Sequence, residues 1–315
     1  MLKRYLQRAP DSVFILFATL SAFGAYFCMY AFRKPFTVAT YEGVGFRDEE
    51  LTYKSALIIS QVIGYALSKF IGIKIISELK SRYRTLLFIV LIVIAEAALL
   101  LFAVVPTPWN VVFMLFNGLP LGMIWGIVFS YLEGRRFTEI LGAGLSASFI
   151  VASGAVKSIG QWLMLNFHVS EFWMPAVTGA IFLMPLLAFA YLLEQIPQPT
   201  PEDIALRTER TPMTGHERAE LFRRYAPGLV LLIAFYTLLT AYRDFRDNFA
   251  AEIWAALGFE GKPYIFTASE TPIAVLVLIM AGATMWIKDN RQALRVYLLL
   301  ILGGAVLVGV STFLY

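Results

Sequence analysis

Charged side chains inside long apolar segments are the residues of this sequence best suited to chemistry. A charge at membrane depth costs roughly a few kcal/mol, so it usually faces a bundle interior or a wet cavity. The cations exceed the acids by two, which favours an anionic ligand, since Arg pairs with carboxylate or phosphate through its planar fork. The residues are Arg33, Lys34, Lys69, Lys157, Arg243 and Arg246, with the acids Glu96, Asp244, Asp247 and Glu270.

Simple structural roles compete with this hypothesis at several positions. Arg33 and Lys34 lie near the outer end of the first apolar segment, where long basic side chains can extend to the membrane surface. The same explanation applies to Lys69. The two arginines of the seventh segment can be neutralised by the neighbouring Asp244 and Asp247. At these positions the binding role and the structural role both remain open.

Other polar residues lie farther from the segment ends. Lys157 is in the middle of its segment among small residues, so its ammonium group reaches the surface less easily and a role in lining a cavity is favoured. Glu96 is a lone acid among apolar residues. It is either a protonated structural group, which we favour, or a proton-binding site. Tyr30 and Tyr65 lie near basic residues and can donate hydrogen bonds to a phosphate or a hydroxylated ligand.

The elements that must position these residues are membrane-spanning helices. Of the 315 residues, 59% are apolar and 15% are charged, against about 25% charged in soluble domains. A soluble core of this size cannot hide so much apolar surface. The composition excludes a soluble enzyme, a nucleic-acid-binding protein and a disulfide scaffold. The single cysteine, Cys28, excludes an intramolecular disulfide, and two histidines cannot form a three-histidine zinc site.

Nine apolar segments are long enough to cross a bilayer as helices, which takes about 20 residues each. The predicted fold is therefore an all-α integral membrane protein with about nine transmembrane helices. The chain contains no HExxH motif, nucleophile elbow or phosphate-binding glycine loop, so we expect neither an enzyme nor a cofactor. The predicted spans are residues 12–33, 54–77, 83–105, 108–132, 141–166, 172–193, 225–250, 265–287 and 293–315.

The distribution of Lys and Arg predicts a cytoplasmic N-terminus. Basic residues gather in alternate loops, whereas the predicted outer loops contain only Arg47, Lys54 and Lys262. The first outer loop is acidic instead, through residues 42–50. We therefore expect a multi-pass protein of the inner (cytoplasmic) membrane. Its expected partners are the lipid bilayer and a small anionic substrate. We expect no binding of nucleic acid and a monomeric state.

The longest polar stretch, residues 194–224, divides the chain into a six-helix bundle (1–193) and a partial bundle of three helices (225–315). Residues 214–217 fit a capping box, which predicts either a short amphipathic helix ending at Arg224 or a plain linker. Six helices, a long loop and further helices are the layout of transporters built from two parallel six-helix repeats. By this layout twelve helices are expected, so either the chain is a fragment that lacks three, which we favour, or the protein itself is truncated.

Several motifs follow one another in a fixed order along the chain. They are YFCMYAFRKPF (26–36), YALSKFI (65–71), LGMIWG (121–126), AYRDFRDNF (241–249) and SETPIA (269–274). Together they resemble the organophosphate:inorganic phosphate antiporters of the major facilitator superfamily. The resemblance implies that Arg33 and Arg243 hold the substrate phosphate, one from each half. It also implies that Lys34 and Lys69 support them, and that Glu270 forms a charge pair, with Lys34 as its expected partner.

The sequence departs from this family at positions that bear on the substrate. Ser153 stands where the glycerol-phosphate carriers of the family have a histidine, and Lys157 follows one turn later. The acid after the arginine of the seventh segment is shifted, with Asp244 and Asp247 as the candidates. The substrate is therefore less defined than the fold.

The predicted function is secondary active transport of a small organic anion by alternating access, with a phosphorylated metabolite exchanged for inorganic phosphate. A transporter-like sensor of an anionic ligand and a proton-coupled symporter using Glu96 or Asp247 are the alternatives. The predicted substrate-binding residues are Arg33, Lys34, Lys69, Lys157, Arg243, Tyr30 and Tyr65, and the predicted charge-pair or gating residues are Glu270, Asp244, Arg246 and Asp247.

Overall fold

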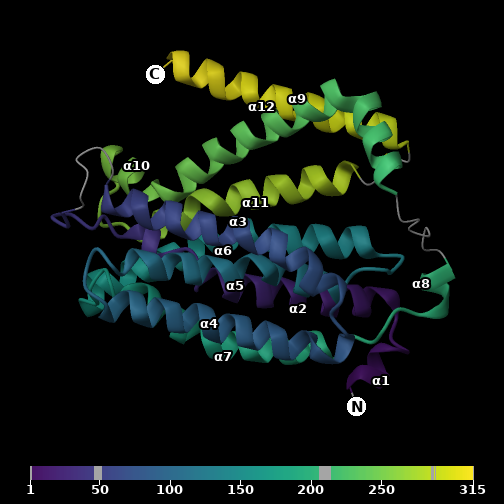
Figure 1. The fold of residues 1–315 in the computed structure, drawn as a ribbon, viewed down its shortest axis with the longest axis horizontal. Helices are drawn as coiled ribbons and strands as arrows, with labels where there is room; N and C mark the ends of the chain where they lie inside the picture. Colours follow the sequence, from purple (N-terminus) through teal and green to yellow (C-terminus); the bar gives the residue numbers. More distant parts are fainter. Residues whose placement is uncertain (1, 46–51, 206–213, 285–286, 288, 315) are drawn as a thin grey trace.

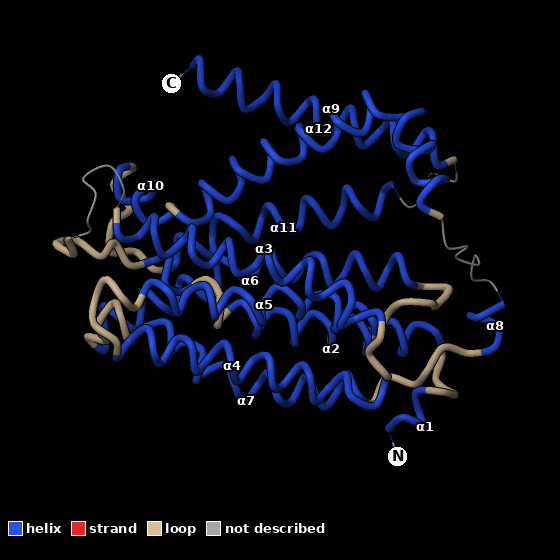
Figure 2. The backbone as a smooth tube through the Cα atoms, in the orientation of Figure 1, coloured by secondary structure: helices blue, strands red, loops and turns tan. Residues whose placement is uncertain are grey.

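The computed structural model describes residues 2–45, 52–205, 214–284, 287 and 289–314, and in these residues the fold is entirely helical (Figures 1 and 2). Two short 3-10 helices, η1 (Pro35–Val38) and η2 (Ser81–Tyr83), accompany the α-helices. The α-helices are α1 (Leu2–Leu6), α2 (Asp11–Tyr30), α3 (Tyr53–Ser77), α4 (Arg84–Val104), α5 (Val111–Ser130), α6 (Thr138–Phe167), α7 (Met174–Glu194), α8 (Pro201–Ala205), α9 (Gly215–Asn248), α10 (Ala250–Ala256), α11 (Tyr264–Thr284) and α12 (Asn290–Leu314).

Eight helices of the described chain are long and apolar enough to cross a membrane, namely α2 to α7, α9 and α12. Within the described residues, these eight helices confirm eight of the nine predicted spans. The ninth predicted span, residues 265–287, coincides with α11, a helix of 21 residues whose described apolar stretch covers Tyr264–Met280. The chain is thus a multi-pass membrane protein. Asp48, Glu49 and Glu50, which belong to the predicted acidic loop, lie outside the described residues.

Helices α2 to α7 form the packed part of the molecule, and α11 lies against α6. In Figure 1, α9 ends near α10 and α11, and it lies farther from the bundle toward its start at Gly215, with α12 beyond it. The apolar stretches of α9 and α12 bury none of their residues against the described chain. The two halves of the chain therefore meet mainly at the α10 end of the bundle and through α11.

Small residues allow α3 and α5 to cross with their backbones nearly in contact. A Cβ atom added to Gly118 would lie 2.2 Å from the carbonyl oxygen of Gln61, and one added to Gly64 would lie 2.1 Å from that of Leu115. Such close approach is how helices associate in lipid, where the hydrophobic effect does not drive them together. This crossing fixes the position of Gln61 and of Asn117 next to Gly118.

Small residues also allow α6 and α11 to pack closely. A Cβ atom at Gly154 of α6 would lie 2.4 Å from the carbonyl oxygen of Phe266 in α11. One turn later, the hydroxyl oxygens of Ser158 and Thr267 lie 2.7 Å apart and form a hydrogen bond. Gly154 and Ser158 thus bring α11, which carries Glu270, onto the six-helix bundle.

The first predicted span ends earlier than expected, because α2 stops at Tyr30 and a turn leads into Pro35 of η1. A proline has no backbone N–H and cannot continue the helical hydrogen bonds. The carbonyl of Phe32 instead accepts a hydrogen bond of 3.0 Å from the Asn117 amide. The carbonyl of Arg33 accepts one of 3.0 Å from Gln61, whose amide nitrogen also donates to Asn117 at 2.8 Å. Two buried amides therefore satisfy the backbone where α2 is broken.

The predicted loop 194–224 contains more helix than expected. Thr214 and Glu217 form both hydrogen bonds of the predicted capping box, but the helix that they begin, α9, continues to Asn248. The expected short helix ending at Arg224 and the plain linker are therefore both wrong. Pro227 removes a single hydrogen bond from a long apolar helix, and α9 continues through it.

The first part of that loop is fastened to the α5–α6 connection by Asp203. Its carboxylate accepts hydrogen bonds from the backbone N–H of Arg136 at 3.0 Å and of Thr200 at 2.9 Å. Burial acts to raise the pKa of Asp203, but these hydrogen bonds and the nearby Arg135 outweigh it and lower the pKa. The carboxylate is therefore charged at neutral pH and holds the segment after α7 in place.

Asn117→Ala removes the side-chain amide that donates hydrogen bonds to the carbonyls of Phe32 and Ala95. Because these groups are buried, we expect the free energy of unfolding to fall by about 1–3 kcal/mol, measured by thermal unfolding of the detergent-purified chain. Asn166→Ala is the control, since its amide is exposed and, within the described residues, donates only to Trp162 of its own helix. Equal losses in the two variants would contradict the role of Asn117.

Gly154→Ala places a methyl group against the Phe266 carbonyl and forces α6 and α11 apart. Overpacking of this kind costs about 1–3 kcal/mol, so we expect a lower midpoint of thermal unfolding. Gly303→Ala in α12 is the matched control, because its Cβ meets no atom within 4 Å. A Gly154→Ala variant as stable as Gly303→Ala would show that α11 does not depend on this contact.

Candidate functional site

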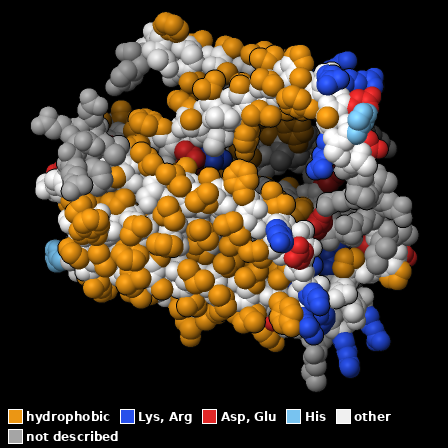
Figure 3. All heavy atoms as spheres, viewed as in Figure 1, with side chains coloured by type: hydrophobic (Ala, Val, Ile, Leu, Met, Phe, Trp, Pro, Cys, Tyr) orange, Lys and Arg blue, Asp and Glu red, His pale blue; other side chains and the backbone are white. Residues whose placement is uncertain are grey.

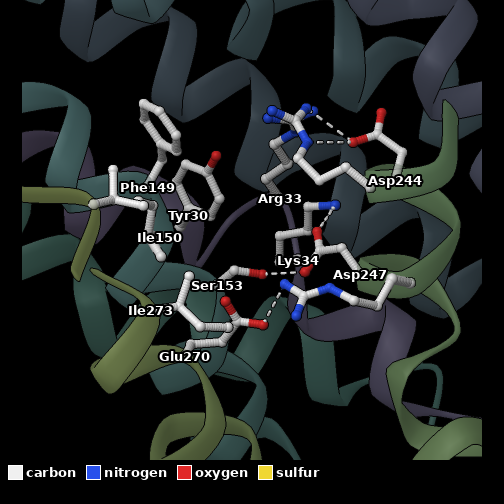
Figure 4. A pocket seen from close by; sticks show the side chains of 13 residues that line it. Tyr30, Arg33, Lys34, Phe149, Ile150, Ser153, Asp244, Asp247, Glu270 and Ile273 are labelled. Carbon is white, nitrogen blue, oxygen red and sulfur yellow. Dashed lines mark hydrogen bonds and ion pairs between the residues drawn. The ribbon is translucent and has the colours of Figure 1, made fainter. Parts of the chain in front are cut away.

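A cavity of about 280 Å³ lies between the end of α2 and helices α6, α9 and α11. Charged side chains from the turn after α2 and from α9 form one wall, and apolar side chains from α6 and α11 form another (Figure 4). Figure 3 shows acidic and basic atoms at the base of the hollow between the outer helices and the bundle. The lining residues are Tyr30, Arg33, Lys34, Phe149, Ile150, Ser153, Arg243, Asp244, Arg246, Asp247, Glu270, Ile273 and Val277.

Asp247 is the centre of a buried ionic cluster at this cavity. Its carboxylate lies 2.5 Å from the Lys34 ammonium, and its other oxygen forms an ion pair with Lys157. The Ser153 hydroxyl donates to the same carboxylate at 2.6 Å, and Lys34 also donates to Asn248 at 2.8 Å. The side chains of the two lysines are only 6% and 4% exposed. One acid thus holds two buried cations and joins α9 to α6 and to the turn after α2.

Two further ion pairs line the cavity and are more open to solvent. Arg246 of α9 pairs with Glu270 of α11 at 2.8 Å. Arg243 pairs at 2.9 Å with Asp244, its neighbour in sequence, and its side chain is 57% exposed. Pairs of this exposure are worth little in stability, about 0–1 kcal/mol. They can therefore be exchanged for other partners at small cost.

Arg33 differs from the other cations of the cavity, because the described residues provide it with no ion-pair partner. Its guanidinium group lies over the ring of Tyr65, 4.1 Å from the ring centroid, and 5.7 Å from that of Tyr30. Its Nε atom is buried without a hydrogen-bond acceptor. In the described part of the chain, and counting Lys157 behind Asp247, five cations around the cavity face three carboxylates, an excess of two positive charges.

The structure brings together most of the residues proposed from the sequence. Eight of the eleven line the cavity, and Lys157 binds Asp247 from behind. Tyr65 does not line the cavity, but its ring contacts the Arg33 guanidinium group. Lys69 lies farther still: it donates to the Gly122 carbonyl at 3.0 Å and lines a separate groove between α3 and α5. Lys69 therefore does not reach the cavity in this structure.

The expected pair between Glu270 and Lys34 is not formed. Lys34 is engaged by Asp247 and Asn248, whereas Glu270, which approaches from α11, meets Arg246. Glu96 lies outside the cavity, on α4, where its carboxylate occupies the space beside Gly179 of α7. One of its oxygens is buried without a hydrogen-bond partner.

A second ion pair between the halves of the chain, buried on the lysine side, was not predicted from the sequence. Lys54, expected in an outer loop, is buried at the start of α3, and its ammonium lies 2.5 Å from the Glu252 carboxylate of α10. Nothing in the sequence pairs these residues. By contrast, Ser153 lies one turn before Lys157 on the same helix face, so this spacing could have assigned it to the site. The described residues contain no group of three or more His, Cys, Asp or Glu placed to hold a metal ion.

Asp247→Asn leaves Lys34 and Lys157 buried without an anion. Loss of one partner from a buried ionic cluster costs about 3–5 kcal/mol, and we expect a loss of this size in thermal unfolding. Glu270→Gln is the matched comparison, because its partner Arg246 is 44% exposed, and we expect about 1 kcal/mol or less. If the two variants lost equal stability, Asp247 would not be the ionic centre of the site.

Comparison with known proteins gives a family without a known activity. A family model described as "Family of unknown function (DUF5690)" matches residues 35–315. No curated protein matches the chain, and no solved structure does. The matched residues include all of the cavity lining except Tyr30, Arg33 and Lys34.

Proposed function

The chain belongs to this family of unknown function, and we propose that it is a secondary active transporter of a small anion. The observation that carries the proposal is Arg33, a guanidinium group beside the cavity that has no carboxylate partner among the described residues. An uncompensated charge at membrane depth is costly. A bound anion would offset that cost, and exchangeable partners such as Arg243 would adjust around it.

The shape and lining of the cavity support a phosphorylated metabolite as the substrate class. A volume of about 280 Å³ is near the lower limit of ligand pockets, which usually measure about 300–1,000 Å³. Arg33 and Arg243 offer planar donor forks that suit phosphate, and the Tyr30 hydroxyl can donate a further hydrogen bond. Apolar side chains such as Phe149 and Ile273 suit a short carbon skeleton. We propose inorganic phosphate as the exchanged ion.

The proposed mechanism is alternating access in a fold of the major facilitator type, in an inner membrane with the N-terminus inside. The ion pairs Lys34–Asp247, Lys157–Asp247 and Lys54–Glu252 join the first six spans to α9 and α10. In the proposed cycle, the anion takes the place of carboxylates on the cations, which frees these links to rearrange. When no anion is bound, the site keeps its excess positive charge, and this charge opposes the conformational change that moves access from one side of the membrane to the other. Exchange is therefore favoured over one-way transport.

We expect phosphate-loaded liposomes containing the chain to exchange labelled phosphate and small organophosphates. Arg33→Gln should abolish exchange, because it removes the uncompensated cation of the cavity. Arg223→Gln is the control, since it removes one exposed basic charge from α9 away from the cavity and should leave exchange intact. The measurement is the initial rate of label uptake.

The outcomes separate the proposed transporter from its alternatives. Saturable binding without flux that requires Arg33 would indicate a sensor. Uptake that collapses with the proton gradient and needs Glu96 or Asp247 would indicate a proton-coupled symporter. Exchange that survives Arg33→Gln at the normal rate would contradict the role given to the cavity.

A further inference from the structure

A second cavity, of about 550 Å³, lies at the opposite end of the bundle from α10. Its walls come from the start of the chain, the α3–α4 connection, the α5–α6 connection and the segment that follows α7. Figure 3 shows Lys and Arg side chains gathered near this end. The lining residues are Lys3, Ser81, Arg82, Arg84, Ser130, Tyr131, Glu133, Gly134, Arg135, Glu194, Ile196, Pro197, Gln198 and Pro199.

Two guanidinium groups of this cavity are held in place by backbone carbonyls rather than by acids. Arg84 donates to the Ser130 carbonyl at 3.0 Å, and Arg135 donates to the Pro197 carbonyl. The described residues give neither arginine an ion-pair partner, and the Nε atoms of both are buried without an acceptor. Arg135 is only 9% exposed, and burial lowers its pKa. Its charge is therefore present at a desolvation cost that an anion would offset.

The rim of the cavity adds further positive charge. Lys3 and Arg82 are exposed, and Arg82 donates no hydrogen bond within the described chain. Among the described residues, the cavity thus collects four cations and two acids, Glu133 and Glu194. Its wall at Pro197 is fixed in turn by Asp203, which binds the backbone of Arg136 and Thr200. Because these donors are already held in position, little further ordering is needed when an anion binds. Such an arrangement favours anion binding, whereas side chains that merely extend to the membrane surface would not be fixed in this way.

We propose that this second cavity binds one phosphate group, as the headgroup of an anionic phospholipid or as a soluble phosphate. Planar guanidinium groups suit phosphate oxygens, and the cavity lies where α4 begins and α5 ends, the depth at which phospholipid headgroups meet membrane-spanning helices. Lys3 and Arg82 would meet the ligand at the rim, and Arg84 and Arg135 would meet it inside. The inference does not rest on the proposed transport.

Native mass spectrometry of the full chain, with phosphatidylglycerol and phosphatidylcholine offered in equal amounts, tests this site. We expect one phosphatidylglycerol to be retained in preference, with affinity about tenfold or more weaker in Arg82→Gln and Arg84→Gln. Arg82→Gln is informative even if Arg84→Gln misfolds, since Arg82 makes no hydrogen bond within the described chain. Arg223→Gln, a basic residue outside the cavity, is the control and should retain the lipid.

Inorganic phosphate, added to the delipidated protein, forms the second arm. A rise in the midpoint of thermal unfolding that disappears in Arg82→Gln, without lipid retention, would assign the site to a soluble phosphate. Equal retention of both lipids together with no effect of phosphate would overturn the proposal. So would an equal loss of phosphatidylglycerol in Arg223→Gln, because binding would then reflect the total basic charge and not this cavity.

Discussion

The structure depends on the hydrogen bonds that satisfy the broken end of α2. In a membrane environment an unpaired backbone carbonyl is costly, and irregular backbone is tolerated only where protein groups or water pair with it. Pro35 ends the helical ladder, and Asn117 and Gln61 take over the carbonyls of Phe32 and Arg33. The turn that results points Arg33 and Lys34 toward α9 instead of continuing them along a helix. Without this turn there would be no cationic wall to the central cavity.

The second constraint is the burial of Lys34 and Lys157, which fixes how α9 meets the bundle. Two ammonium groups removed from water require an anion close by, and Asp247 is that anion for both. Since the apolar stretch of α9 is not buried against the described chain, this ionic cluster and the Lys54–Glu252 pair hold one end of α9 in place. The charges that line the cavity therefore also connect the two halves of the chain.

The sequence was informative about residue types and much less so about partners. Length and hydropathy predicted the helices, because each membrane-spanning helix forms its backbone hydrogen bonds within itself and needs no contact with a distant part of the chain. The same local reasoning missed the end of α2 at Tyr30 and the extension of α9 back to Gly215. Costly charges such as Arg33 and Asp247 identified the cavity. Their pairing was not predictable, because whether Glu270 meets Lys34 or Arg246 depends on how α11 packs against α6 at Gly154.

The two cavities manage positive charge in opposite ways, which bears on the roles proposed for them. In the central cavity three carboxylates already occupy most of the cations, and the exposed pairs of Arg243 and Arg246 are weak. An anion that enters there exchanges partners, so its binding is coupled to the contacts that join the two halves. In the second cavity Arg84 and Arg135 are anchored to backbone carbonyls, so an anion adds contacts without breaking any. The first arrangement suits a ligand that must leave again, and the second suits one that stays.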